Sequence, residues 1–233
     1  MLHSLALIPL APVLLWQGKQ VRTHTPRLPE ADGPRTGVNK GSNADMSLLI
    51  LGDSAAAGVG VDHQQAALAG RLIEALAPLT VDWQLEAQTG LRVRDYLAEP
   101  DRLPEGSMDV VVISLGVNDV TSSISTGKWI QQVEDLLGRL AIRYQPRQLL
   151  FTAVPPMHEF PALPQPLRWY LGARADAFNR KLRALLATRP GMQFIDVAFE
   201  KAPGVMASDG FHPGENGYRI WANALADQIK RGR

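Results

Sequence analysis

Short apolar runs and longer amphipathic runs alternate from Ser47 to the end of the chain, and this alternation limits the fold more than any other feature. It is typical of strand and helix units that repeat around a parallel sheet. The Val110–Ser114 run is continuous and β-branched, as expected of a strand buried on both faces. We expect an α/β fold with a five-stranded parallel sheet. The strands are expected at Ser47–Leu51, Trp83–Ala87, Val110–Ser114, Leu149–Ala153 and Gln193–Val197, and the helices at Gln65–Ala77, Val93–Leu97, Trp129–Tyr144, Leu167–Ala187 and Glu215–Lys230.

The first 44 residues lie outside this alternation. Leu5–Trp16 is largely apolar, but it contains two prolines and is too short to span a bilayer comfortably. A secretory signal needs Lys or Arg before its apolar run, and only His3 precedes this one. We expect the run either to pack on the domain or on a partner chain, or to make peripheral membrane contact through residues 5–16.

Basic residues follow this apolar run at Lys19, Arg22 and Arg27. If the run touches a membrane, this positive flank keeps the rest of the chain in the cytoplasm. We therefore expect a cytoplasmic protein, with membrane association, or export to the periplasm or the medium, as alternatives. Residues 23–43 are rich in Pro, Gly and charge, which indicates an extended connector. The chain is thus divided into an amino-terminal segment, 1–44, and one folded domain, 45–233.

Composition narrows the chemistry that this domain can perform. Lys and Arg total 24 against 23 for Asp and Glu, so the formal net charge is +1 and no strong field attracts nucleic acid. The chain has no cysteine, which excludes disulfides, thiolate nucleophiles and cysteine-ligated zinc. We expect a small-molecule partner and a nucleophile that is an oxygen or a nitrogen.

Ligands of open α/β sheets bind beyond the carboxyl ends of the strands. In this sequence those positions are polar and rich in glycine. They are Gly52–Ser54 after the first expected strand, Gln88–Gly90 after the second and Leu115–Asp119 after the third, and Asp209–Pro213 precedes the last helix. We therefore expect the site to be built from these four segments.

Ser54 is the candidate nucleophile, because a serine at a sharp turn from strand to helix can hold its hydroxyl above the sheet. The turn lacks the second glycine of a Gly-x-Ser-x-Gly elbow, since residue 56 is alanine. This departure disfavours the ordinary α/β-hydrolase fold. The alternative is that Asp53 or Ser54 merely caps the following helix.

Asp209 and His212 are the candidate partners of that serine. At a spacing of three residues, the carboxylate can orient the imidazole that would act as base. Pro213 favours an extended conformation at His212 and opens the next helix. The alternative is a surface turn in which both side chains satisfy local backbone groups.

A serine nucleophile attacking a carbonyl also needs donors for the oxyanion that forms. The candidates are the backbone N–H groups of Ser54 and Gly90 and the side-chain amide of Asn118. Gly90 lets the backbone approach a ligand closely, although a glycine or an asparagine after a strand is equally expected in an ordinary turn.

Taken together, these four segments resemble the SGNH hydrolase superfamily of GDSL-type esterases and lipases. Its name lists the residue types found here as Ser54, Gly90, Asn118 and His212, and the resemblance covers about residues 47–231. It implies a flavodoxin-like, three-layer α/β/α sandwich and ester hydrolysis with no metal or cofactor. The chain is most similar to bacterial GDSL-type esterases and to lysophospholipase or thioesterase-like enzymes, and its long amino-terminal extension departs from the pattern.

We therefore expect a serine carboxylesterase that acts on short-to-medium acyl esters through an acyl-serine intermediate. A lysophospholipase, a thioesterase or a sugar O-acetyl esterase would use the same site. The proline-rich segment 155–169 suggests a stiff apolar loop beside the site, and we expect Phe160, Leu163 and Trp169 to line the acyl pocket. The alternative is a stiff connection packed on the core.

Two other classes of protein compete with this interpretation. A metal-dependent phosphoesterase could use Asp53, Asp119, Asp209 and His212 as ligands, but it leaves Ser54 without a role. A non-catalytic module that binds a nucleotide, a sugar or an ester is the second, although the Gly-x-Gly-x-x-Gly spacing of dinucleotide sites is absent.

Overall fold

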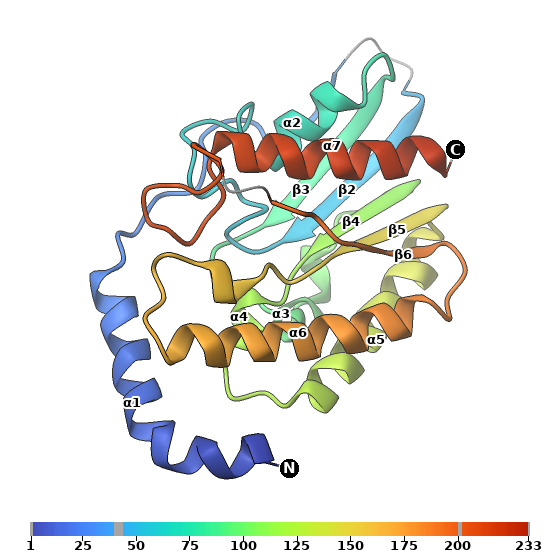
Figure 1. Cartoon of the computed structure of the whole chain (residues 1–233). Helices are drawn as coiled ribbons and strands as arrows, with labels where there is room; N and C mark the ends of the chain where they lie inside the picture. Colours follow the sequence, from blue (N-terminus) through green and yellow to red (C-terminus); the bar gives the residue numbers. More distant parts are fainter. Residues whose placement is uncertain (1, 40–43, 200–201, 233) are drawn as a thin grey trace.

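A twisted sheet forms the centre of the molecule (Figure 1). The computed structural model describes residues 2–39, 44–199 and 202–232, with side chains from residue 10 onward. In this part of the chain the sheet has six strands in the order β1-β3-β2-β4-β5-β6, and β2 to β6 are parallel. The order of these five is that of flavodoxin-like sheets, which confirms the expected fold class. The strands are β1 Thr36–Val38, β2 Met46–Gly52, β3 Val81–Ala87, β4 Val110–Ser114, β5 Gln148–Thr152 and β6 Met192–Ile195.

The sixth strand corrects the expected count of five. β1 lies within the segment expected to be an extended connector, and it pairs antiparallel with β3, with Gly37 opposite Trp83. A side chain at residue 37 would begin 3.3 Å from the Trp83 indole nitrogen, so the glycine lets the edge strand lie close to that ring. Three residues at a sheet edge carry no apolar alternation, and for this reason the sequence did not predict them.

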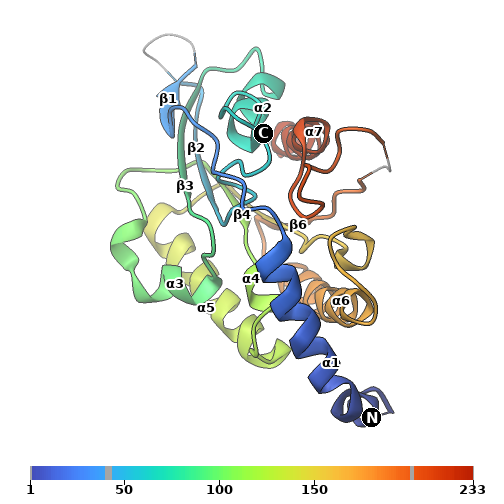
Figure 2. The same ribbon diagram turned by 90° about the vertical axis from the view of Figure 1, so that its left-hand side faces the viewer.

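Two helical layers cover the sheet (Figures 1 and 2). Alternate residues of β2 enter different cores: Leu49 and Leu51 pack with the side of α3, α5 and α6, and Leu48 and Ile50 pack with the side of α2 and α7. All four leucine and isoleucine side chains are fully buried, as in a parallel strand covered on both faces. The α-helices are α1 Leu2–His24, α2 Leu68–Ala75, α3 Val93–Ala98, α4 Val117–Val120, α5 Thr126–Tyr144, α6 Leu167–Leu186 and α7 Glu215–Arg231, with 3-10 turns at η1 Pro100–Arg102 and η2 Met157–Glu159.

The amino-terminal run is part of a long helix, α1, that lies beside α6 in both views (Figures 1 and 2). The Gln17 side chain donates to the Gln165 carbonyl at 2.7 Å and accepts from the Leu167 amide at 3.0 Å. It therefore satisfies a backbone group at the start of α6, where the helix itself offers no acceptor. Within the apolar run, Leu14 is buried in the core and Leu10 packs against it, so this part of the run packs on the domain. Val13, Leu15 and Trp16 are exposed, and membrane contact stays a prediction. Among the described residues, no helix combines the length and apolar character needed to cross a bilayer.

Candidate active site

Ser54 stands two residues beyond the end of β2. Gly52, the last residue of that strand, has no room for a side chain, since an added Cβ would lie 2.3 Å from Ala56 Cβ and 2.9 Å from the Ser114 carbonyl oxygen. The chain can therefore turn back sharply over the strand end. Residues 54–60 form consecutive turns, and the next helix, α2, begins at Leu68, against the expected start at Gln65. Asp53 Oδ1 accepts the Ala55 amide at 3.2 Å and stabilises this turn.

His212 connects Ser54 to Asp209. Its Nε2 lies 2.8 Å from Ser54 Oγ, and its Nδ1 lies 2.6 Å from Asp209 Oδ2. The other carboxylate oxygen, Oδ1, accepts the backbone amides of Phe211 at 2.9 Å and His212 at 3.0 Å. The structure thus brings together the serine, the histidine and the aspartate singled out in the sequence, in the geometry that a nucleophile and its base require.

The Asp209 carboxylate is almost fully buried, with a side-chain exposure of 1%. Burial by itself raises its pKa. The hydrogen bonds from the His212 ring and from the amides of His212 and Phe211 outweigh this effect, so the pKa of Asp209 lies below its ordinary value. Asp209 is therefore a carboxylate at neutral pH and can stabilise a positive charge that forms on the imidazole.

The loop that contains Gly90 is joined to the turn of Ser54 through Asn118. The Asn118 amide nitrogen donates to the Leu91 carbonyl at 3.0 Å and lies 3.4 Å from Asp53 Oδ2. Gly90 is exposed and has a φ of +90°, a conformation that favours glycine. Asn118 thus contacts the residues adjacent to the two backbone donors named in the sequence, Ser54 and Gly90.

Two buried carboxyl groups lie near this contact and are a finding of the structure. Burial raises the pKa of Asp53 to about 7, against hydrogen bonding from Ala55. Burial also raises the pKa of Asp119 to about 6, and its Oδ2 is 3.4 Å from the Val93 amide. The sequence indicated Asp53 and Asp119 only by their positions after strands. Their raised pKa values could not be predicted, because they depend on burial in the folded structure.

A cavity of about 1090 Å³ opens beside Ser54 and His212. Phe160 and Phe211 form part of its wall and pack edge to face, with ring centroids 5.0 Å apart. Phe211 was missed as a lining residue, although its place between Asp209 and His212 is a signal that could have identified it. Further apolar lining comes from Leu115, Val117, Val154, Val197, Phe199, Val205 and Met206.

Phe160 alone of the three predicted pocket residues lines this cavity. Leu163 is buried in the core beside α5 and α6, and Trp169 lies on α6 with 41% of its surface exposed. The expectation that they line the acyl pocket is therefore wrong. The segment turns through η2 and enters α6, which directs its second half away from the cavity, so the alternative of a connection packed on the core applies to Leu163.

The arrangement offers little to a divalent cation. In the described ranges, no group of three or more His, Asp or Glu side chains is placed to hold a metal ion. The Asp209 carboxylate already binds the His212 ring and two amides, which occupies the oxygens that a metal would need. The contact of Ser54 with His212 favours a serine hydrolase over a metal-dependent phosphoesterase, because the phosphoesterase would not use Ser54.

A doubly wound sheet with a serine, a histidine and an aspartate at the carboxyl ends of its strands defines a class of hydrolases that act on acyl groups. The chain belongs to the GDSL-like lipase/acylhydrolase family, whose family model matches residues 50–220. It is a carboxylic ester hydrolase, as the sequence predicted. A comparison with curated proteins finds no match.

Many solved structures share this fold and cover 80% or more of this chain. A carbohydrate esterase family 2 enzyme with a carbohydrate-binding domain from Corynascus thermopiles (Myceliophthora fergusii) has a TM-score of 0.67 at 15% identity, over 83% of this chain and 68% of that one. A lipolytic G-D-S-L protein from Veillonella parvula DSM 2008 has a TM-score of 0.64 at 14% identity, over 80% and 99% of the two chains. TesA has a TM-score of 0.63 at 21% identity, also over 80% and 99%.

Proposed function

We propose that this chain is a serine carboxylesterase that hydrolyses short-to-medium acyl esters, with Ser54 as nucleophile, His212 as general base and Asp209 as its orienting carboxylate. The observation that carries the proposal is the continuous set of contacts from Ser54 Oγ through the His212 ring to the buried Asp209 carboxylate, at the edge of a cavity whose lining is mostly apolar.

The contacts translate into two acyl-transfer steps. His212 Nε2 takes the proton of Ser54 Oγ as the oxygen attacks the ester carbonyl, and His212 then returns that proton to the departing alcohol. The acyl-serine left behind is attacked by water, whose proton also passes to His212 Nε2, and the acid leaves as Ser54 regains its proton. Asp209 keeps the other ring nitrogen protonated throughout and stabilises the imidazolium.

We assign the oxyanion that forms in each step to three donors. They are the backbone N–H groups of Ser54 and Gly90 and one N–H of the Asn118 side chain. The Asn118 amide has two hydrogens: one is held by the Leu91 carbonyl, and the other faces Asp53 at 3.4 Å, which is too long for a strong bond. That second hydrogen is the one available to the substrate.

The expected chain length follows from the cavity wall. The Phe160 and Phe211 rings pack against each other beside His212, and the Pro155–Pro156 pair stiffens the backbone next to them. This stiff wall gives the side of the cavity next to His212 a fixed shape, and we expect it to favour short and medium acyl chains. Proteins of this fold include one described as an acetylxylan esterase and one described as a lipase, so the acyl group and the alcohol are the properties to measure.

The experiment is hydrolysis of p-nitrophenyl esters from acetyl to palmitoyl by the full-length protein and the Ser54→Ala variant, with a strong chelator present. We expect chelator-resistant activity with a maximum at acetyl to octanoyl, and a loss of about 10⁴- to 10⁶-fold in the variant. If Ser54→Ala were as active as wild type, the assignment of Ser54 as nucleophile would be refuted. A maximum at palmitoyl would favour a lysophospholipase or thioesterase, and activity confined to acetyl esters would favour a sugar O-acetyl esterase.

A further inference from the structure

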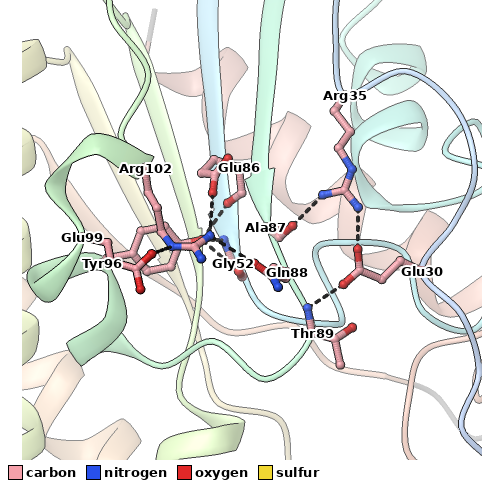
Figure 3. Close-up of polar contacts among 10 residues, drawn as sticks. All are labelled: Glu30, Arg35, Gly52, Glu86, Ala87, Gln88, Thr89, Tyr96, Glu99 and Arg102. Atoms are coloured by element: carbon pink, nitrogen blue, oxygen red, sulfur yellow. Dashed lines mark hydrogen bonds and ion pairs between the residues drawn. The ribbon is translucent and has the colours of Figure 1, made fainter.

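The connector between α1 and β2 crosses the carboxyl end of β3 and contacts the loop that carries Gly90 (Figure 3). The Arg35 guanidinium donates to the Ala87 carbonyl at 2.5 Å and to Glu30 Oε2 at 2.6 Å. The other Glu30 oxygen, Oε1, accepts the Thr89 backbone amide at 2.6 Å. Two residues of the connector thus bind the backbone immediately before Gly90.

These contacts are anchored in the sheet. The Leu85 amide donates to the Arg35 carbonyl at 2.7 Å, so Arg35 is fixed to β3 by its backbone as well as by its side chain. The side chains of Arg35 and Glu30 are 37% and 27% exposed, respectively. Partial burial raises the pKa of Glu30, but hydrogen bonds from Thr89 and Arg35 outweigh that effect and lower it. Glu30 is therefore charged when it holds the Thr89 N–H.

Gly90 itself has no packing that could fix its position. It is exposed, and a Cβ added to it would meet no atom within 4 Å. Its neighbours are fixed instead: Thr89 is held through its N–H by Glu30, and Leu91 is held through its carbonyl by Asn118. The direction of the Gly90 N–H is thus set by hydrogen bonds on either side of it.

A second cluster holds the same loop from the other side (Figure 3). Arg102 donates to Gln88 Oε1 at 3.2 Å and to Glu86 Oε1 at 3.3 Å. These are contacts between side chains, whereas Glu30 and Arg35 bind backbone groups. The Gln88 backbone is held as well, since its N–H donates to the Gly52 carbonyl and its carbonyl accepts the Leu91 N–H, both at 3.3 Å. The Thr89 N–H, next to Gly90, is held by Glu30 of the connector.

We propose that Glu30 and Arg35 are positioning residues, which aim the Gly90 N–H at the oxyanion of the reacting ester. This inference rests on the proposed function, because it takes Gly90 as an oxyanion donor. The two residues lie before the matched family region, 50–220, so this role belongs to a part of the chain that the family model does not cover. An oxyanion donor acts only when it is held within a few tenths of an ångström of its place, so release of Thr89 should lower kcat.

The test compares Glu30→Ala, Glu30→Gln and Arg35→Ala with wild type, all as full-length protein. Loss of one whole oxyanion donor costs about 10²–10³ in kcat, and a misdirected donor should cost roughly 10-fold. We expect kcat to fall about 10-fold in Glu30→Ala while KM stays within about 3-fold. Glu30→Gln should recover part of the loss, because its amide oxygen can still accept the Thr89 N–H.

Two further readouts separate positioning from general damage. A trifluoromethyl ketone forms an oxyanion on the serine, so its Ki should rise in Glu30→Ala by the factor by which kcat/KM falls. Amide exchange of residues 88–91 should quicken in the same variant. The control is Glu74→Ala, which removes an exposed partner of Arg71, 2.8 Å away. Glu74 does not line the cavity, so this variant should change none of these values.

Wild-type kcat and Ki in Glu30→Ala would overturn the inference, even if amide exchange quickened, because the loop would then be free without consequence for the oxyanion. Failure of the proposed function has a different signature. Wild-type protein would hydrolyse none of the esters, and exchange at residues 88–91 would still decide whether the connector holds the loop. Unchanged exchange in Glu30→Ala would overturn the inference in that case as well.

Discussion

Replacing Asp209 by Asn should reverse the proton positions on His212 while leaving the shape of the site intact. The Asp209 Oδ1 atom accepts two backbone amides, from Phe211 and His212. An Asn side chain must keep its oxygen at that position, because its NH₂ group would otherwise face two donors. The NH₂ group is then directed at His212 Nδ1, which lies 2.6 Å from Asp209 Oδ2 in the wild type.

The consequence for the base can be worked out from that orientation. An NH₂ donor requires His212 Nδ1 to be unprotonated, so the single proton of the neutral ring moves to Nε2. Nε2 then donates to Ser54 Oγ, 2.8 Å away, and cannot take the serine proton. In serine proteases the corresponding replacement lowers kcat by about 10⁴, which equals about 5.5 kcal/mol of transition-state stabilisation. We expect a loss of that order here.

The assay is steady-state hydrolysis of the best p-nitrophenyl ester, with the melting temperature measured beside it. Asp227→Asn is the matched control, since Asp227 is exposed on α7 and its replacement should leave kcat unchanged. We expect a KM within about 3-fold of wild type for Asp209→Asn, because the change does not alter the cavity wall. If Asp209→Asn keeps kcat within 10-fold of wild type, the tautomer argument is refuted.

Two predictions concern stability. Tyr96→Phe removes a fully buried hydroxyl that accepts the Gly52 amide and donates to the Glu86 carbonyl. The variant should lose about 2 kcal/mol of free energy of unfolding and melt about 4–8 °C lower. Tyr170→Phe is the control, and equal melting temperatures for the two variants would contradict the reasoning. Asp53 has a pKa of about 7 in the folded protein, against the ordinary value of 3.8, so the folded state binds the Asp53 proton more tightly than the unfolded state does. This proton therefore stabilises the fold fully below pH 3.8, and the stabilisation is lost as the pH rises to about 7. Wild type should therefore lose up to about 4 kcal/mol relative to Asp53→Asn between pH 4 and pH 8, in urea unfolding at the two pH values; a constant difference would argue against a buried, proton-binding Asp53.

The parts of the fold that the sequence predicted best are those whose burial is symmetrical. Val110–Ser114 was predicted at its observed ends, because a strand covered on both faces is apolar throughout. The first residues of α6 and α7, Leu167 and Glu215, were also predicted correctly, since a proline precedes one and a glycine precedes the other. α1 was not predicted as a helix, because Pro9 and Pro12 interrupt its run and oppose a helical assignment.

Some residues of the site could also be predicted from the sequence, and others could not. Asp209 and His212 could be paired from the sequence, because three residues in one turn bring them together whatever the rest of the fold does. Leu163 and Trp169 could not be placed, since the direction of a side chain in a loop depends on where the loop turns. Glu30 and Thr89 are 59 residues apart, and neither segment contains a sequence pattern that predicts their contact.

β1 has a consequence for the behaviour of this protein in concentrated solution. It is only three residues long, and it covers part of the outer edge of β3, a strand of seven residues. An uncovered strand edge presents free N–H and C=O groups that can pair with another copy of the chain. A shortened protein that begins at Asp45 would lack this cover and expose the Trp83 edge to intermolecular strand pairing. We therefore expect the shortened protein to self-associate at concentrations at which the full-length protein does not.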